Sequence, residues 1–386
     1  MKTHLKTFIL SLTLIGFMAC NANNKKQTQN DLAEVTVKHH PNKQYIKVAL
    51  LLDTSNSMDG LIDQAKAQLW DIVNELSYAK CGDEKPNLQI ALYEYGNDRL
   101  HSAEGYIRQV LAFSNDLDDI SKELFSLTTN GGNEYCGQVI QTALNQLNWG
   151  NNPDDLKLVF IAGNEPFTQG SVHYKDASVN AKEKDVTINT IFCGNYNQGV
   201  STHWKDGAKL TNGDYMAIDH NQKTVHIASP YDDKILMLNQ QLNKTYVAYG
   251  KRGRDKVAEQ AQQDTNARVY GYANAVKRSV SKSSHFYKNA SWDLVDAVEN
   301  EEVVIEDLKE EALPEVLKGK SESEIKAYVA KKKTERAAIQ KKIQELNVKR
   351  TKYISEQSRT KNTNGLENAM TKAIKEQAKK KQYTWD

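Results

Sequence analysis

Residues 46–57 read IKVALLLDTSNS, and this stretch decides the fold. Its first part, residues 46–52, is a nearly continuous apolar run of strand length, which is typical of a strand buried at the centre of a parallel sheet. After a polar break, apolar residues from Leu61 to Leu76 recur at spacings of three and four. That spacing predicts an amphipathic helix with one buried stripe. Strand, loop and helix in this order open an α/β domain.

The alternation of strand and helix continues to about residue 225. Two strand patterns, 88–95 and 106–113, have a polar connection short enough for a hairpin at the sheet edge. Further helices are expected at 116–127, 138–147, 177–184 and 204–210, and further strands at 156–162, 186–193 and 215–219. This βαβ series predicts a doubly wound, Rossmann-like and mostly parallel sheet. Such sheets bind ligands beyond the carboxyl ends of their strands.

An Asp-x-Ser-x-Ser motif follows the first strand directly, at Asp53, Ser55 and Ser57. One carboxylate and two hydroxyls are hard oxygen ligands of the kind that Mg²⁺ takes. An ion held by so few charges accepts a carboxylate from another molecule, which is adhesion chemistry rather than catalysis. The alternative is that these side chains only cap the next helix. The position at the ligand-binding edge favours the metal site.

Residues 48–58, VALLLDTSNSM, resemble the opening of a von Willebrand factor type A domain. The resemblance covers about residues 45–225. It implies a metal-ion-dependent adhesion site in which Asp53, Ser55 and Ser57 are the first ligands of Mg²⁺, or of Mn²⁺ or Ca²⁺. It also implies a protein-binding module rather than an enzyme, with a partner that presents an exposed Asp or Glu.

The family's threonine ligand has no clear equivalent in this chain. In the family this Thr follows a glycine pair, whereas residues 131–132 are glycines followed by Asn133. Thr129, Asn133 and Glu134 are therefore the candidates for this role.

The family's last aspartate is also replaced. It belongs to a Thr-Asp-Gly stretch after the fourth strand, and the aligned position here is Gly163. Glu165 or Asn164 is the nearest oxygen donor. Because hard cations lose affinity as carboxylates are removed, a type A domain that no longer uses metal is an alternative.

Cys136 and Cys193 are both expected at the rim where the strands end. A disulfide between them and two separate buried thiols are equally consistent with the sequence. A different functional class, a cell-envelope hydrolase, would use Cys136 or Glu165 on the same rim. No nucleophile motif supports it, so the sequence favours a protein without enzymatic activity.

The N-terminus has the architecture of a signal peptide. Basic residues precede an apolar run from Phe8 to Ala19, which is shorter than the roughly 20 residues of a membrane span. The run ends at Cys20 and resembles the lipobox of bacterial lipoproteins, which implies that Cys20 is acylated. Cleavage by an ordinary signal peptidase is the alternative. Residues 21–44 are expected to tether the protein to the inner or outer membrane, facing the periplasm or the cell surface.

The second half of the chain is expected to be helical. Residues 226–300 keep apolar clusters at helical spacing and are expected to pack on or next to the first domain. Residues 301–386 are highly charged, with a thin apolar stripe between 321 and 361, which predicts a long, exposed, coiled-coil-like helix.

The charge balance excludes a general affinity for nucleic acid. The chain has 51 Lys and Arg against 49 Asp and Glu, so no overall positive field is present. No glycine-rich phosphate-binding pattern follows the first strand, which leaves nucleotide binding without support. The expected partners are a protein with an exposed acidic residue and a membrane reached through the lipid anchor.

The predicted anchor gives the first test. Replacing Cys20 with Ser removes the thiol that would carry lipid, so the variant should lose both labelling by a fatty-acid analogue and its place in the membrane fraction. Unchanged labelling and fractionation would show that Cys20 is not the anchor.

Overall fold

The computed structural model describes residues 44–221, 227–357 and 366–385. The predicted signal peptide, Cys20 and all of the tether except Gln44 lie outside these residues.

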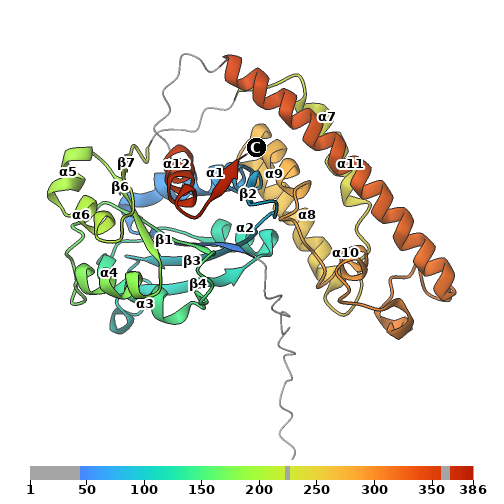
Figure 1. Ribbon diagram of the computed structural model, residues 1–386, viewed down its shortest axis with the longest axis horizontal. Coiled ribbons are helices and arrows are strands. Elements are labelled where there is room, and N and C mark those ends of the chain that lie inside the picture. Colours follow the sequence, from blue (N-terminus) through green and yellow to red (C-terminus); the bar gives the residue numbers. More distant parts are fainter. Residues whose placement is uncertain (1–43, 222–226, 358–365, 386) are drawn as a thin grey trace, which may run out of the picture. The chain divides into compact units, whose positions relative to one another are not determined.

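A six-stranded sheet with the order β4-β3-β1-β5-β6-β7 forms the first part of the chain (Figure 1). All its strands are parallel except the edge strand β4, which pairs antiparallel with β3. The strands are β1 (Tyr45–Asp53), β3 (Asn87–Tyr95), β4 (Ile107–Ser114), β5 (Leu156–Gly163), β6 (Thr187–Cys193) and β7 (Tyr215–Ile218). The predicted doubly wound, mostly parallel sheet is confirmed, including the hairpin at its edge.

Helices cover both faces of the sheet, and each face has its own apolar core. The first core involves α1 (Asp59–Leu76), α2 (Leu117–Ser126) and α12 (Leu366–Lys379). The second involves α3 (Cys136–Gln146), α4 (Tyr174–Glu183) and α6 (Trp204–Lys209), while α5 (Tyr196–Ser201) lies between β6 and α6 in the chain. Successive β1 residues point into alternate cores, because side chains alternate across a strand. This two-sided burial explains the continuous apolar run in its sequence.

The chain then forms a helical region, as predicted. Its helices are α7 (Asp232–Asn243), α8 (Gly253–Val269), α9 (Tyr272–Lys282), α10 (Leu294–Glu299) and the 36-residue α11 (Glu322–Gln357). Buried charges connect α8 and α9 to α2 of the sheet domain. The Arg278 guanidinium lies 2.7 Å from the Asp118 carboxylate, and the Lys256 ammonium lies 2.9 Å from that of Asp116. The Tyr287 hydroxyl also donates to Asp118, at 2.6 Å.

The last described residues differ from the exposed, charged region expected over 301–386. Leu366, Met370 and Ile374 of α12 are buried in the first core, and α12 packs against α1. Strand β8 (Tyr383–Trp385) then pairs antiparallel with β2 (Ala79–Cys81). The pattern was missed because α12 has only a short apolar stripe among many lysines. The sheet domain is thus completed by the chain's last helix and strand.

Among the described residues, no helix combines the length and the apolar character needed to cross a membrane.

The docking of α12 can be tested by truncating one side chain in its apolar stripe. Ile374 is 1 % exposed, so Ile374→Ala should lower the free energy of unfolding by about 2–5 kcal/mol through lost burial and the cavity left behind. The exposed neighbour Lys372 provides the control, since Lys372→Ala should change it by less than about 0.5 kcal/mol. Urea unfolding measures both. Equal midpoints for the two variants would mean that α12 does not belong to the core.

Candidate functional site

The Asp-x-Ser-x-Ser motif lies at the carboxyl end of β1, at the centre of the sheet. Asp53 is fully buried and its Oδ1 accepts a hydrogen bond of 2.7 Å from the Ser55 backbone N–H. The Ser55 and Ser57 hydroxyls lie 3.2 Å apart. The short 3-10 helix Asn56–Met58 and α1 follow, and neither has a side-chain hydrogen bond at its N-cap. Helix capping therefore does not explain the three side chains.

Glu134 is brought next to Asp53 from the loop before α3. It is 4 % exposed, and a hydrogen bond links the two carboxyl groups. Gly96, just after β3, makes the room. A Cβ at this position would lie 2.8 Å from both Asp53 Oδ1 and Glu134 Cγ. Gly96 also has a φ of +79°, which favours glycine. The structure therefore pairs two carboxyl groups that are 81 positions apart in the sequence.

Burial and proximity make the two carboxyl groups hard to ionise together. Burial, followed by the negative charge of Glu134, raises the pKa of Asp53 well above its ordinary value. Burial is also the main cause that raises the pKa of Glu134. A pair of this kind retains a proton between its carboxyl groups unless a cation compensates the charge.

Three buried oxygens at this site have no hydrogen-bond partner among the described residues: Asp53 Oδ2, Glu134 Oε2 and Asn164 Oδ1. Asn164 follows β5 directly, and its Nδ2 donates 3.1 Å to the Ser57 hydroxyl, which places its side chain at the motif. Buried polar atoms without partners are costly and call for an explanation. A carboxylate or amide oxygen that carries no proton needs a donor or a cation, so a bound cation is one partner that each of them could take.

The donor set suits a hard divalent ion. In the described ranges, no group of three or more His, Cys, Asp or Glu side chains is placed to hold a metal. Asp53 and Glu134 supply the carboxylates here, and the other candidate donors are hydroxyl and amide oxygens. Mg²⁺, Mn²⁺ and Ca²⁺ accept such oxygen ligands and commonly keep waters as well.

The other predicted ligands lie away from the paired carboxyl groups or at the surface. The Thr129 hydroxyl donates to Asp59, and the side chains of Asn133 and Glu165 are exposed. The Glu165 backbone hydrogen-bonds to the Glu134 side chain, so its main chain supports the site. Of the three candidates for the threonine role, Glu134 is the one that the structure brings to Asp53.

Gly163 has no space for the family's aspartate. A Cβ there would lie 2.5 Å from the Tyr95 hydroxyl and 3.2 Å from Asp53 Oδ2. The Tyr95 hydroxyl donates 2.9 Å to the Ala162 carbonyl oxygen and so fills this space. Sequence reasoning missed Tyr95, although it pairs in register with Asp53 across β1 and β3.

The structure has no disulfide between Cys136 and Cys193, because both are free. They lie on opposite faces of the sheet, with Cys193 in the first core and Cys136 in the second. Burial raises the pKa of both thiols well above its ordinary value. A buried, protonated thiol is a poor nucleophile, which counts against the hydrolase that would use Cys136.

The fit between Gly163 and Tyr95 can be tested with a double-mutant cycle. Gly163→Ala should lower the free energy of unfolding by about 1–3 kcal/mol, because the new methyl group overpacks against the hydroxyl. Removing that hydroxyl with Tyr95→Phe should make the alanine less costly, so the double variant should be more stable than the sum of the single effects predicts. Additive effects in urea unfolding would show that Tyr95 does not exclude a side chain at position 163.

Comparison with known proteins identifies the domain. Residues 47–205 match the family described as von Willebrand factor type A domain. No curated protein matches the chain.

Several solved structures resemble part of the chain. The conserved hypothetical protein BatB from Bacteroides thetaiotaomicron is 15% identical, covers 45% of this chain and 90% of its own, and has a TM-score of 0.35. The SpRpn10 VWA domain is 15% identical over 47% of this chain and 99% of its own, with a TM-score of 0.34. Proximal thread matrix protein 1 from the mussel byssus was solved with a zinc-occupied MIDAS motif. It is 14% identical over 45% of this chain and 42% of its own, with a TM-score of 0.34. On the family match over residues 47–205, this chain contains a von Willebrand factor type A domain.

Proposed function

We propose that this chain is a membrane-anchored protein-interaction module whose type A domain uses a divalent cation to bind an Asp or Glu of a partner. The observation that carries the proposal is the buried pair Asp53 and Glu134, with unpartnered oxygens that face no cationic side chain at the site. Type A domains are interaction modules, and we propose no enzymatic activity for this one.

The residues that would hold the cation differ from the family pattern in one respect. Asp53, Ser55 and Ser57 lie together at the carboxyl end of β1, and Asn164 would add an amide oxygen. Glu134 supplies the carboxylate that is missing at Gly163, so the site keeps two carboxylates. The change moves one negative charge from the end of β5 to the loop before α3.

The exposed end of the motif indicates where a partner would approach. Asp53 and Ser55 are buried, whereas Ser57 is exposed. A cation between them would be reached from the Ser57 side and would supply the positive charge that binds a partner's carboxylate. Asn56, Asn133 and Glu165, whose side chains are exposed, lie on the loops around this opening. The anchoring part of the proposal rests on the Cys20 motif.

Two alternative functions, a metal-free scaffold and a hydrolase, lead to different expected results. A type A domain used only as a scaffold would not respond to metal. A hydrolase would turn over an ester or peptide substrate, and its activity would disappear with Cys136→Ser or Glu165→Gln. The burial of Cys136 makes the first of these variants the less informative one.

Thermal unfolding with and without metal tests the proposal. In the wild type, Mg²⁺, Mn²⁺ or Ca²⁺ should raise the melting temperature above its value in EDTA, because a ligand of the folded state stabilises it by about 2.7 kcal/mol at 100 times its Kd. Asp53→Asn and Glu134→Gln should each abolish the rise. In EDTA both variants should be at least as stable as the wild type, since an amide at either position removes the cost of protonating a second buried carboxyl group or of burying its charge.

Glu165→Gln is the matched control, because its side chain is exposed and its hydrogen bond to Glu134 comes from the backbone, which the substitution keeps. It should keep the metal response. A wild type that shows no shift at millimolar metal would favour the metal-free scaffold. Loss of the response in Glu165→Gln but not in Glu134→Gln would assign the second carboxylate to Glu165.

A further inference from the structure

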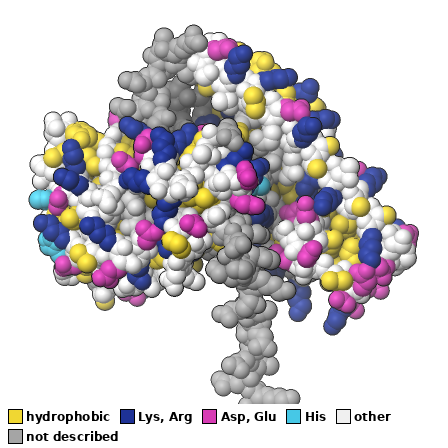
Figure 2. Space-filling model, viewed as in Figure 1, with side chains coloured by type: hydrophobic (Ala, Val, Ile, Leu, Met, Phe, Trp, Pro, Cys, Tyr) yellow, Lys and Arg dark blue, Asp and Glu magenta, His cyan; other side chains and the backbone are white. Residues whose placement is uncertain are grey.

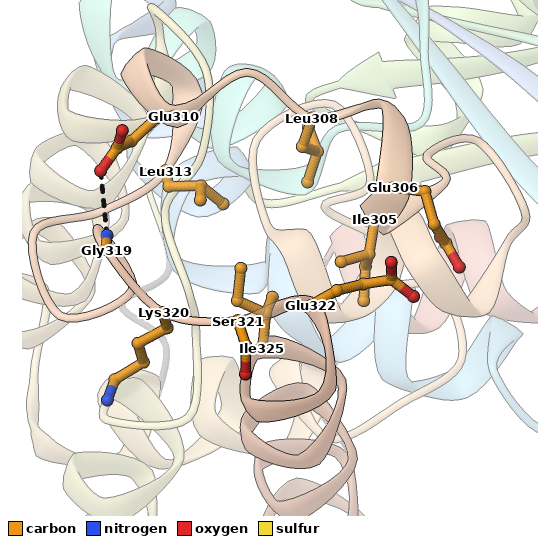
Figure 3. Close-up of a pocket in the computed structure, with 10 residues that line it drawn as sticks. All are labelled: Ile305, Glu306, Leu308, Glu310, Leu313, Gly319, Lys320, Ser321, Glu322 and Ile325. Atoms are coloured by element: carbon orange, nitrogen blue, oxygen red, sulfur yellow. Dashed lines mark hydrogen bonds between the residues drawn. The ribbon is translucent and has the colours of Figure 1, made fainter.

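The segment that joins α10 to α11 surrounds an open cavity of about 580 Å³. Four apolar side chains line it: Ile305, Leu308, Leu313 and Ile325. Figure 3 shows Glu310 on one side of these residues and Glu306 on the other. The volume is in the range of protein pockets that bind small molecules or side chains.

The walls of the cavity are fixed before any ligand arrives. Ile305, Leu313 and Ile325 belong to a small core with Val247 and Leu294. Gly319 has a φ of +68°, and its N–H donates 2.9 Å to the Glu310 carboxylate at one side of the cavity (Figure 3).

The start of α11 is fixed in the same way, by a capping box. The Ser321 N–H and hydroxyl each donate 2.8 Å to Glu324, whose own N–H donates back to the Ser321 hydroxyl. The cavity therefore does not depend on a mobile side chain to stay open.

Apolar surface remains exposed around this preformed cavity. Val304 and Val316 are 54% and 53% exposed, and Leu308 is only partly buried. Exposed apolar side chains are ordinary when scattered, but a group of them beside a cavity is typical of a docking site.

The rim of the cavity is strongly acidic. Residues 299–324 contain ten Asp or Glu against three Lys or Arg, whereas the whole chain has a net charge of +2. Glu306 and Glu322, which line the cavity, both pair with Lys326. Elsewhere in the same segment, over the described ranges, Glu301, Glu302, Asp307 and Glu311 are exposed and form no ion pair with Lys or Arg. Figure 2 shows acidic side chains gathered at the lower right, over this segment. The uncompensated negative charge attracts cationic partners and repels anionic ones.

We propose that this cavity, with its acidic rim, docks a short cationic peptide segment of a partner protein. One apolar side chain of the segment enters the space among Leu308, Leu313 and Ile325, and flanking Lys or Arg residues lie over the acidic rim. The rim disfavours an anionic lipid surface by like-charge repulsion. The chain then has two docking surfaces of opposite preference, because the cation site takes an acidic residue and this cavity takes basic ones.

Fluorescence anisotropy of the full chain with three labelled peptides tests the proposal. EDTA is present throughout, so that the cation site does not contribute and the two proposals can fail separately. A peptide of leucines among lysines should bind, and its affinity should fall at least about tenfold when the salt is raised from low to 1 M, because salt screens exposed charges. A second peptide has glutamate in place of each lysine, and a third has glycine in place of each leucine. Each should bind at least about tenfold more weakly than the lysine-leucine peptide.

Variants locate the binding. Leu308→Asp places a charge in the cavity at a partly buried position, and Glu302→Lys with Glu311→Lys reverses two charges of the rim. Each should weaken binding of the lysine-leucine peptide at least about tenfold, while circular dichroism shows that the variant remains folded. Glu183→Lys, an exposed reversal on α4, is the matched control and should bind as the wild type does.

Other outcomes would overturn the proposal. No binding of the lysine-leucine peptide, or binding that none of the cavity variants weakens, would do so. Sedimentation that shows a dimer converted to a monomer by Leu308→Asp would assign the cavity to a second copy of this chain. Binding to phosphatidylglycerol vesicles that Leu308→Asp abolishes would assign it to a lipid surface.

Discussion

The burial of β1 on both faces is the constraint on which the rest of the structure depends. Its side chains alternate between two separate cores, so polar groups along the strand are confined to its ends. Near the amino end, Lys47 lies 3.9 Å from Asp155 and donates to two backbone carbonyls. At the carboxyl end, Asp53 has another acid as its neighbour. The same strand therefore begins beside a compensated charge and ends beside an uncompensated one.

The buried carboxylates of the helical region differ from Asp53 in having cationic side chains beside them. Arg278, 1 % exposed, lies between the carboxylates of Asp118 and Asp264, and its guanidinium stacks on Trp70 at 4.9 Å. Two cations beside it lower the pKa of Asp264, although burial alone would raise it. Buried charges are tolerated where an opposite charge satisfies them. Asp53 and Glu134 follow this rule only if a proton or a cation joins them.

The sequence predicted most of the fold because its elements have clear periods. The expected strands and helices up to residue 218 lie within a few positions of those observed, whereas β2 and α5 were not predicted. The failures have physical causes. Cys136 and Cys193 are close to the same rim, but the alternation along β6 puts Cys193 on the opposite face from α3. The apolar stripe of α12 is too short to stand out among charged residues, and its partner α1 lies about 300 positions earlier.

The sequence singles out only those candidate site residues that lie close together along the chain. Asp53, Ser55 and Ser57 form a contiguous motif, so their common position follows from one strand and one turn. Glu134 could not be chosen over Thr129 and Asn133, because its approach depends on the absence of a side chain at Gly96, on a different loop.

The return of α12 and β8 to the sheet domain affects the order in which the chain can fold. Residues 366–385 are synthesised after the rest of the sheet domain, yet Leu366, Met370 and Ile374 pack in the same core as residues of α1, about 300 positions earlier. Contacts between such distant positions close a large loop and slow folding. Until that loop closes, the α1 side of the sheet remains partly uncovered and open to association with other unfolded chains.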